Sequence, residues 1–386
     1  TMKKYLSNTS ILLFLIVLLS FGCNRNQTSN NKSWTLGPFV KVDSVNPIMG
    51  AVDSLVFMGP VHHFQVKWAA KDVFNPAAVV RNGKLYLLYR AEDSIGKLAG
   101  TSRIGLAVST NGLTFWRYPK PVLYPDSDKY IKYEWDGGTE DPRVVQDDNG
   151  TYYMTYTAWN GNRTRLFIAT SKDLVNWTKH GSVFRKAYNG KYFNIFTKSG
   201  AIVCRRVGGK FIATKINGKY WMFFGDTNIY IAYSDDLINW TPVEKNKGKI
   251  PDSVDNRYGK ASLFAALKPR KGKFDSQLVE PGPFALVTKK GILLIYNSKN
   301  SKEYGDTTLP DGTYAAGQAL FDINNPERLI ARTKSYFMKP SKPYEITGQV
   351  NNVCFVEGLA FFHNKWFLYY GTADTKIAVA VYSPKQ

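Results

Sequence analysis

Two adjacent carboxylic acids, Glu140 and Asp141, lie in the segment GGTEDPR at residues 137–143. Glycine and proline are typical of turns, and acids beside an arginine usually form a weak ion pair on a solvated turn. The alternative is a reactive site, because carboxyl groups on opposite sides of a sugar can cleave a glycosidic bond, one as acid and one to activate a nucleophile. The position of the segment in the chain separates the two interpretations.

Further polar residues follow the strands predicted elsewhere in the chain. They are Arg90, Glu92 and Asp93 in YRAED, Asp226 in FFGDT, Asn297 in YNSKN and Asp374 in GTADT. Carboxylates interleaved with Arg, Asn, Trp and Tyr suit a carbohydrate, whose hydroxyls need donors and acceptors and whose C–H faces stack on rings. Other chemistries lack their signatures. The four histidines have no metal-ligand spacing, no cofactor is indicated, and neither a G-x-S-x-G elbow nor a P-loop is present.

An internal repeat provides the elements that position these residues. Five turn pairs, each followed by β-branched and aromatic residues, have their second residue at positions 83, 150, 218, 291 and 364. This composition is typical of a hairpin leading into a buried strand. Five units of about 70 residues without helical periodicity predict an all-β fold, a five-bladed β-propeller over residues 34–386.

Another strand is predicted directly before each turn pair, and four of these five strands begin with a polar residue. These residues are Asn75, Asp141, Glu280 and Glu357. The innermost strands of a propeller line its central channel, where ligands usually bind. We therefore expect Glu140 and Asp141 to belong to an axial pocket and not to a surface turn.

The N-terminus has the pattern of a lipoprotein signal over residues 1–23. Lys3 and Lys4 precede the apolar run ILLFLIVLL, and SFGC ends at Cys23, which would be lipidated after cleavage. An uncleaved anchor helix is the alternative. Residues 24–33 are polar and of low complexity, as expected of a flexible tether. Both interpretations predict an exported protein attached to a bacterial membrane, in the periplasm or at the cell surface.

The formal net charge of +21 allows anionic partners. The lysines are dispersed among turns and form no basic stripe, and export argues against nucleic acid as a partner. We interpret the charge as favouring solubility and attraction to anionic surfaces. Cys204 and Cys354 are the two cysteines beyond the signal. They could pair, but we expect two buried thiols.

The chain resembles glycoside hydrolase family 130, five-bladed propellers that act on β-mannosides. The matching segments are FNPA (74–77), YR (89–90), SRIG (102–105), GGTEDPR (137–143), KINGKYW (215–221), YEITGQVNNVCF (344–355) and YYGTADT (369–375). The resemblance implies that Asp141 is the acid. It also implies that a mannosyl unit is held by Asn75, Arg90, Arg103, Glu140 and Asp374. We add four further polar residues as candidates for binding substrate: Asp93, Arg143, Lys215 and Asn297.

Many members of this family are phosphorylases, which bind phosphate through converging cations. In this chain Lys215 remains, but Tyr296-Asn297-Ser298 replaces a Tyr-His-Gly stretch, and Asp226 stands where an arginine is expected. These departures resemble the exported hydrolases that cut β-1,2-mannosides. Asp226 and Glu280 would then activate water in an inverting reaction.

Two alternatives stay open. One is a phosphorylase that releases mannose 1-phosphate, and the other is a non-catalytic lipoprotein that binds glycans. Under each of them β-mannoside oligosaccharides are the expected partners.

Overall fold

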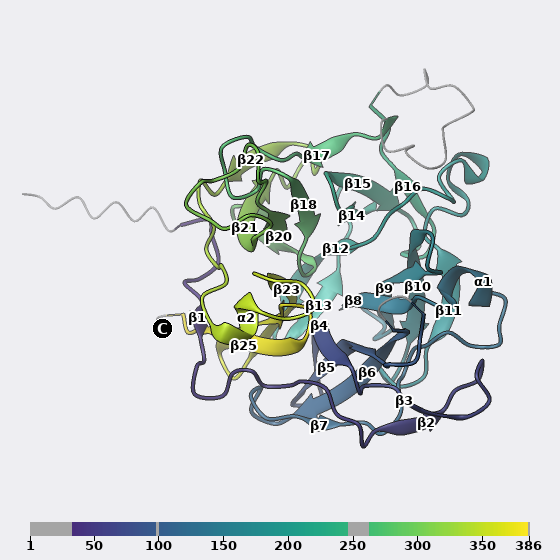
Figure 1. The fold of residues 1–386 in the computed structure, drawn as a ribbon. Helices are drawn as coiled ribbons and strands as arrows, with labels where there is room; N and C mark the ends of the chain where they lie inside the picture. The colour runs from purple at the N-terminus through teal and green to yellow at the C-terminus, as the bar shows by residue number, and fades with distance from the viewer. Residues whose placement is uncertain (1–32, 98–99, 246–261, 385–386) are drawn as a thin grey trace, which may run out of the picture. The chain divides into compact units, whose positions relative to one another are not determined.

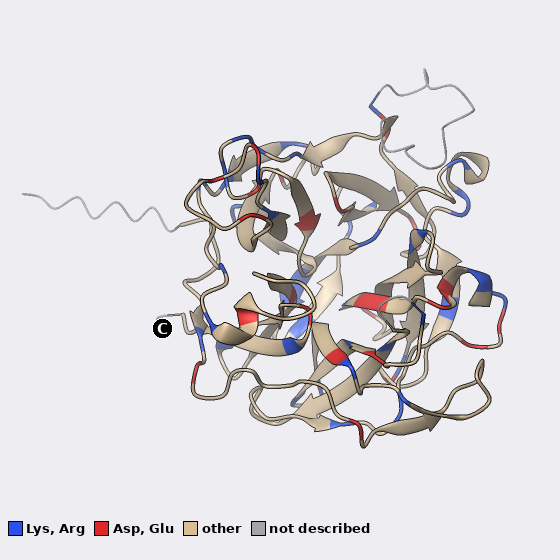
Figure 2. Ribbon diagram, in the orientation of Figure 1, with Lys and Arg blue, Asp and Glu red and all other residues tan. Residues whose placement is uncertain are grey.

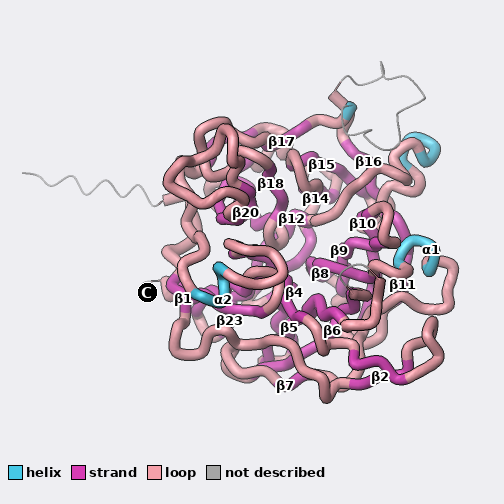
Figure 3. The backbone as a smooth tube through the Cα atoms, viewed as in Figure 1, coloured by secondary structure: helices cyan, strands magenta, loops and turns pink. Residues whose placement is uncertain are grey.

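The computed structural model describes residues 33–97, 100–245 and 262–384. The expected lipoprotein signal with Cys23 lies outside these residues, as does the tether except for Ser33. In the described part of the chain no helix is long and apolar enough to cross a membrane. The residues from Trp34 onward belong to one compact unit, in which strands dominate (Figures 1 and 3).

The strands pair in five antiparallel sets that follow one another along the chain. The first set comprises β4 (Asp72–Arg81), β5 (Lys84–Glu92), β6 (Ser102–Ser109) and β7 (Trp116–Arg117). The second comprises β8 (Gly138–Gln146), β9 (Tyr152–Trp159), β10 (Thr164–Ser171) and β11 (Thr178–Ser182). The third comprises β12 (Ala201–Val207), β13 (Lys210–Ala213), β14 (Tyr220–Phe224), β15 (Ile229–Ser234), β16 (Trp240–Pro242) and β17 (Ala265–Leu267).

The last two sets have the same order. The fourth comprises β18 (Leu278–Pro281), β19 (Ala285–Thr288), β20 (Gly291–Lys299), β21 (Tyr314–Phe321) and β22 (Leu329–Arg332). The fifth comprises β23 (Cys354–Phe362), β24 (Lys365–Thr372), β25 (Lys376–Tyr382) and the N-terminal strand β1 (Val40–Lys41), which pairs with β25. A separate pair is formed by β2 (Val56–Met58) and β3 (Gln65–Lys67).

The helices that lie wholly within the described residues are few and short. They are α1 (Ile131–Glu134), the 3-10 helix η1 (Ala187–Gly190) and α2 (Pro343–Ile346). Figure 1 shows the sets around a common centre, where β4, β8, β12 and β23 come together. The innermost strands of neighbouring sets are also linked by short parallel pairings, as between Val203–Cys204 of β12 and Ala285–Leu286 of β19.

The hairpins predicted at the turn pairs are present. Asn82 and Gly83 connect β4 to β5 with φ of 50° and 70°, and Asn217 and Gly218 have φ of 52° and 78° before β14. Two consecutive positive φ angles are those of a type I′ turn, which matches the twist of paired strands and favours Asn-Gly. The turn residues therefore set the register of each hairpin.

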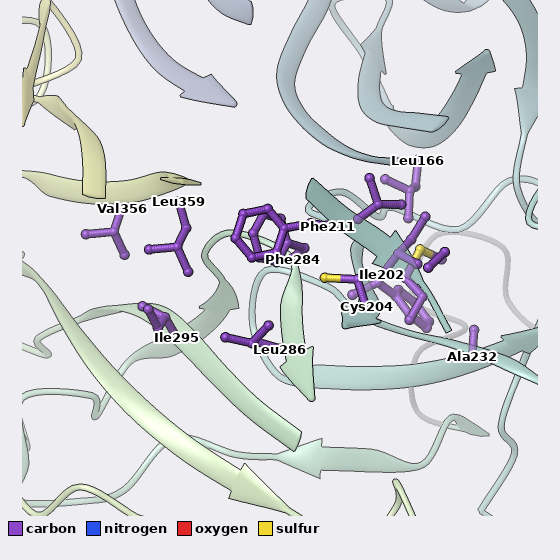
Figure 4. Close-up of a cluster of buried hydrophobic side chains, with 14 of the residues drawn as sticks. Leu166, Ile202, Cys204, Phe211, Ala232, Phe284, Leu286, Ile295, Val356 and Leu359 are labelled. Carbon is purple, nitrogen blue, oxygen red and sulfur yellow. The ribbon is translucent and has the colours of Figure 1, made fainter. Parts of the chain in front are cut away.

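The apolar core lies between the sets, so that middle strands such as β20 are buried on both faces. One cluster joins side chains from the second to the fifth set (Figure 4), and among them Leu166, Cys204, Leu286 and Leu359 are buried. Cys204 and Cys354 are free, buried thiols, as expected.

Candidate functional site

The innermost strands leave their regular ladder at the polar residues singled out in the sequence. The strand pairing skips Asn75 in β4, Asp141 in β8 and Glu357 in β23. Asn75 and Asp141 have left-handed φ angles of 46° and 48°. Glu280 lies in β18 one residue before that strand ends at Pro281. A bulge redirects the side chain of the residue that it leaves unpaired, which lets these strands present polar groups to a shared space.

A cavity of about 100 Å³ lies between these strands. It is lined by Asn75, Arg90, Asp141, Lys198, Glu280, Tyr314, Val350, Val353, Phe355 and Asp374. The lining comes from the first, second, fourth and fifth sets and from segments that join the sets. Charged segments are visible at the centre of Figure 2. Larger hollows occur elsewhere, including a groove of about 600 Å³ beside Tyr118 and Trp177, but none of the acids at the strand starts lines it.

Arg90 forms ion pairs with three carboxyl groups on one side of the cavity. Its Nη1 lies 3.3 Å from Asp141 Oδ1, and its Nη2 lies 2.8 Å from Glu140 Oε1 and 2.7 Å from Glu92 Oε1. Asn75 donates a hydrogen bond of 3.0 Å from Nδ2 to the same Asp141 oxygen. The acid pair is therefore held by donors from the neighbouring set.

Glu280 occupies a second, separate cluster of the cavity wall. Ser199 Oγ donates a hydrogen bond to its Oε1, and Lys198 Nζ lies 3.6 Å from the same oxygen. Burial, reinforced by the charge of Asp226, raises the pKa of Glu280, although Lys198, Arg143 and Ser199 oppose the shift. A carboxyl group with a raised pKa, in the wall of a cavity that a second acid also lines, is suited to accept a proton from water.

The pKa values of the adjacent acids Glu140 and Asp141 shift in opposite directions. Burial alone would raise the pKa of Asp141, but Arg90, Lys198 and the hydrogen bond from Asn75 outweigh it and lower this pKa. Burial and the charges of Asp141 and Glu92 raise the pKa of Glu140 to about 7 against the effect of Arg90. The cations and Asn75 therefore favour the ionised form of Asp141 in the folded protein.

The sequence comparisons extend over most of the described chain. Residues 52–385 match the profile of glycoside hydrolase family 130, which is described as beta-1,4-mannooligosaccharide phosphorylase. The chain belongs to glycoside hydrolase family 130. It is 34% identical over 328 residues to a 1,2-beta-oligomannan phosphorylase of Thermoanaerobacter sp. (strain X514), covering 83% of this chain and 92% of the relative. A beta-1,2-mannobiose phosphorylase of the same organism is 31% identical, with 82% and 91% covered.

Solved structures of family 130 members are similar along the whole unit. One, from a study of family 130 glycoside hydrolases that target beta-1,2 mannosidic linkages in Candida mannan, has a TM-score of 0.86 and 45% identity over 92% of this chain and 96% of that chain. A glycosyl hydrolase of Bacteroides ovatus has a TM-score of 0.85, also with 45% identity and the same coverage.

Asp226 contributes to the site through its charge. It is half-buried at the end of the β14 hairpin strand and raises the pKa values of Glu280 and Lys198. It does not line the cavity itself. The charge of Asp226 therefore acts on the Glu280 cluster, and its predicted role in activating water stays a prediction.

Several predicted substrate contacts lie elsewhere. Lys215 is exposed, with its Nζ 5.1 Å from the ring of Tyr220, and it is absent from the cavity wall. Asn297 uses both ends of its amide on the backbone of Val356, at 2.9 and 2.7 Å. Neither residue lines the cavity, so the substrate-binding roles of Lys215 and Asn297 stay predictions.

Asp93 and Arg103 also have structural partners. Asp93 Oδ1 accepts hydrogen bonds from the backbone of Gly96 and Thr101, at 2.9 and 3.0 Å, and its Oδ2 lies 2.6 Å from Arg103 Nη1. Both side chains are buried and neither lines the cavity. They support the loop between β5 and β6, and the predicted contact with a sugar is not made from this position.

Arg143 is likewise buried away from the cavity lining, with all three of its guanidinium nitrogens donating to backbone carbonyls. Its role in binding substrate stays a prediction, because the observed contacts of Arg143 are to backbone carbonyls and to Glu357.

Sequence reasoning missed Lys198, Ser199 and Tyr314. Lys198 and Ser199 lie just before β12, which begins at Ala201. β12 is the one innermost strand without an initial carboxyl or amide group, so an alignment of the five strand starts could have indicated these two residues. Tyr314 begins β21, and burial raises its pKa to about 12, so its hydroxyl stays a donor. No sequence signal distinguished Tyr314 from the many core tyrosines.

Proposed function

We propose that this protein hydrolyses β-mannosidic bonds, most favourably β-1,2 linkages, by inversion in the central cavity. The observation that carries the proposal is the pairing of Lys198 with Glu280 at 3.6 Å, in the wall of the cavity that Asp141 also lines. Phosphate binds best where several cationic donors converge without carboxylates. Here each cation on the cavity wall already faces a carboxyl group, which disfavours a dianion and favours a neutral water molecule.

The sugar is held by the groups that line the cavity. Asn75, Arg90 and Asp374 offer donors and acceptors to the hydroxyls of a mannosyl unit, while Tyr314 and Phe355 offer rings, with centroids 6.3 Å apart. When a neutral sugar displaces water from Asp141, desolvation raises the pKa of this carboxyl towards the working pH. The bound substrate thereby promotes the protonated state that an acid catalyst needs.

The reaction transfers two protons. Asp141 donates its proton to the glycosidic oxygen as the bond to the anomeric carbon breaks, and the leaving sugar departs as an alcohol. Glu280, assisted by the charge of Asp226, removes a proton from the water that attacks the opposite face. Asp141 ends ionised and Glu280 protonated, and exchange with solvent restores both.

We also infer that the five strand sets are the blades of a five-bladed β-propeller. Five antiparallel sets, apolar cores between neighbouring sets and polar strand starts around one cavity support this architecture. The inference of a lipid-anchored, exported enzyme rests on the N-terminal sequence alone.

Phosphorolysis is the second candidate, favoured by the names of the relatives that are 31–34% identical. The deciding experiment incubates the protein with β-1,2-mannobiose, with and without inorganic phosphate, and identifies the products. We expect mannose alone, at a rate independent of phosphate. Mannose 1-phosphate as the main product would instead establish a phosphorylase.

Asp141→Asn tests the acid. We expect kcat to fall by about 10³-fold or more with little change in binding, because only proton transfer in the transition state is lost. Glu280→Gln should behave similarly, whereas Lys67→Gln, at an exposed position with its Nζ 3.8 Å from Asp53, serves as the control and should leave the rate unchanged. A fully active Glu280→Gln protein would contradict the assignment of the base.

A further inference from the structure

Arg143 uses its guanidinium group to join two chain segments of the site. Nε donates to the carbonyl oxygen of Gly282 at 2.6 Å, and Nη2 donates to that of Pro281 at 2.8 Å. Nη1 donates to the carbonyl oxygen of Asp141 at 3.2 Å. The side chain is 2% exposed, so these bonds are shielded from competition with water. Such a planar, multidentate arrangement holds its partners in one geometry.

The carbonyls that Arg143 binds are not random backbone positions. Pro281 and Gly282 directly follow Glu280, and β18 ends between them. Asp141 itself is skipped by the pairing of β8 with β9. The β8 segment therefore lacks the regular ladder at Asp141, whereas Glu280 and Pro281 pair with Asn297 and Tyr296 of β20 up to the strand end. The guanidinium supplies a direct connection between these segments of the second and fourth sets.

Glu357 faces the same guanidinium from the fifth set. Its Oε2 lies 3.6 Å from Arg143 Nη2, too far for a hydrogen bond, and neither of its carboxyl oxygens has a hydrogen-bond partner among the described residues. The side chain is 1% exposed. Asp141 and Glu280 are the nearby acids and Arg90 is the other nearby cation. Because Glu357 accepts no hydrogen bond from Arg143, the guanidinium donors of Arg143 stay bonded to the three carbonyl oxygens.

We propose that Arg143 is a positioning residue that sets the separation of the Asp141 and Glu280 carboxyl groups. The proposal rests on the hydrolysis proposed above, because an inverting reaction needs its two carboxyl groups roughly 6.5 to 9.5 Å apart, with room for water. A displacement of about 1 Å can reduce turnover by about 100-fold. Arg143 does not line the cavity, and it acts through the two chain segments that it joins.

Substitution by lysine separates geometry from charge. Arg143→Lys keeps a cation near Asp141 and Glu280 but loses the planar set of donors. We expect kcat to fall roughly 10- to 100-fold, KM to change less than about threefold, and both limbs of the pH profile to keep their positions. In Arg143→Gln the charge is also lost. Arg143 lowers the pKa values of both carboxyl groups, so both limbs should move to higher pH.

Arg117→Lys is the matched control. Arg117 also donates to a backbone carbonyl, that of Gly50 at 2.6 Å, but on the outermost strand of its set and away from the cavity. We expect this variant to keep its kcat per folded molecule. If Arg143→Lys does not fold, Arg143→Gln, which buries no unpaired ammonium, provides the kinetic test, with kcat of each protein taken at its own pH optimum.

A crystal structure of the Arg143→Lys protein with mannose bound completes the test. We expect the distance between the Asp141 and Glu280 carboxyl groups to differ from that in the wild-type complex. An unchanged distance, or wild-type kcat in the lysine variant, would overturn the proposal. All rates are measured with and without phosphate. A wild-type requirement for phosphate would refute hydrolysis, while the carboxyl separation would still decide the role of Arg143.

Discussion

At the scale of single residues, the site holds more carboxyl groups than it can ionise in a buried space. Asp374 is an example. Burial, reinforced by Asp141 and Glu92, raises its pKa to about 7 despite the opposing charge of Arg90. It also has a left-handed φ of 53°, which asparagine tolerates as well as aspartate. Asp374→Asn is therefore a change of charge with little change of backbone preference.

Asp374→Asn should stabilise the protein at neutral and higher pH. A carboxyl group whose pKa rises on folding contributes stability that is complete below its unfolded value near 3.8 and is lost as the pH rises to about 7. The neutral asparagine avoids this loss. Between pH 5 and pH 8 we expect the advantage of the variant in unfolding free energy to grow by about 2 kcal/mol.

Urea unfolding at the two pH values measures this difference. Asp53→Asn, at an exposed aspartate whose carboxylate lies 3.8 Å from Lys67, is the control and should show no such growth. A constant difference between Asp374→Asn and wild type at both pH values would mean that Asp374 is ionised in the folded protein. The variant should also lose activity, since Asp374 lines the cavity.

At the scale of elements, a polar turn is repeated in three of the strand sets. Ser171 Oγ accepts hydrogen bonds from the backbone of Asp173 and Leu174, and Asp173 Oδ1 accepts them from Val175 and Asn176, at 2.8 to 3.1 Å. Ser109 Oγ and Ser234 Oγ accept equivalent hydrogen bonds from the backbone of Gly112 and Leu237. These side chains replace the ladder where the chain reverses before the outermost strand.

Asp173→Ala should destabilise the protein by about 1 kcal/mol, because two backbone donors lose their acceptor at a partly exposed turn. The free energy of unfolding from urea titration measures the change. Asp148→Ala, which removes an exposed ion pair with Arg205, is the control and should alter stability by no more than about 0.5 kcal/mol. Equal effects of the two substitutions would show that the turn bonds contribute no more than a surface charge.

The repeated turn pairs made the hairpins predictable, because Asn-Gly requires a backbone that few other dipeptides adopt. The strand starts likewise indicated Asn75, Asp141 and Glu280. The partners of Arg143 were not predictable, since a bulge in one strand and a strand end in another decide which carbonyls it reaches. The role of Lys215 stays a prediction for a related reason, because family resemblance locates a residue in the chain but not the direction of its side chain.

At the scale of the whole molecule, the inferred attachment to a membrane depends on one residue of the sequence. Replacing Cys23 with alanine should move the protein from the membrane fraction to the soluble fraction, since the lipid is attached through its thiol. Membrane fractionation with immunodetection measures the change, and the released protein should keep the activity of the wild type. Unchanged retention in the membrane fraction would favour an uncleaved anchor helix.

The fifth set is completed by strand β1, where Val40 and Lys41 pair with Val381 and Ala380 of β25. Residues more than 300 positions apart in the chain thus become neighbours, and the sheet is assembled from both ends. A circular permutant is the natural consequence: residue 384 could be joined to residue 34 by a short linker, and new termini could be opened in the exposed turn at Asn217 and Gly218. In such a molecule the last set would be continuous along the chain, and its closure would no longer depend on a contact between distant ends.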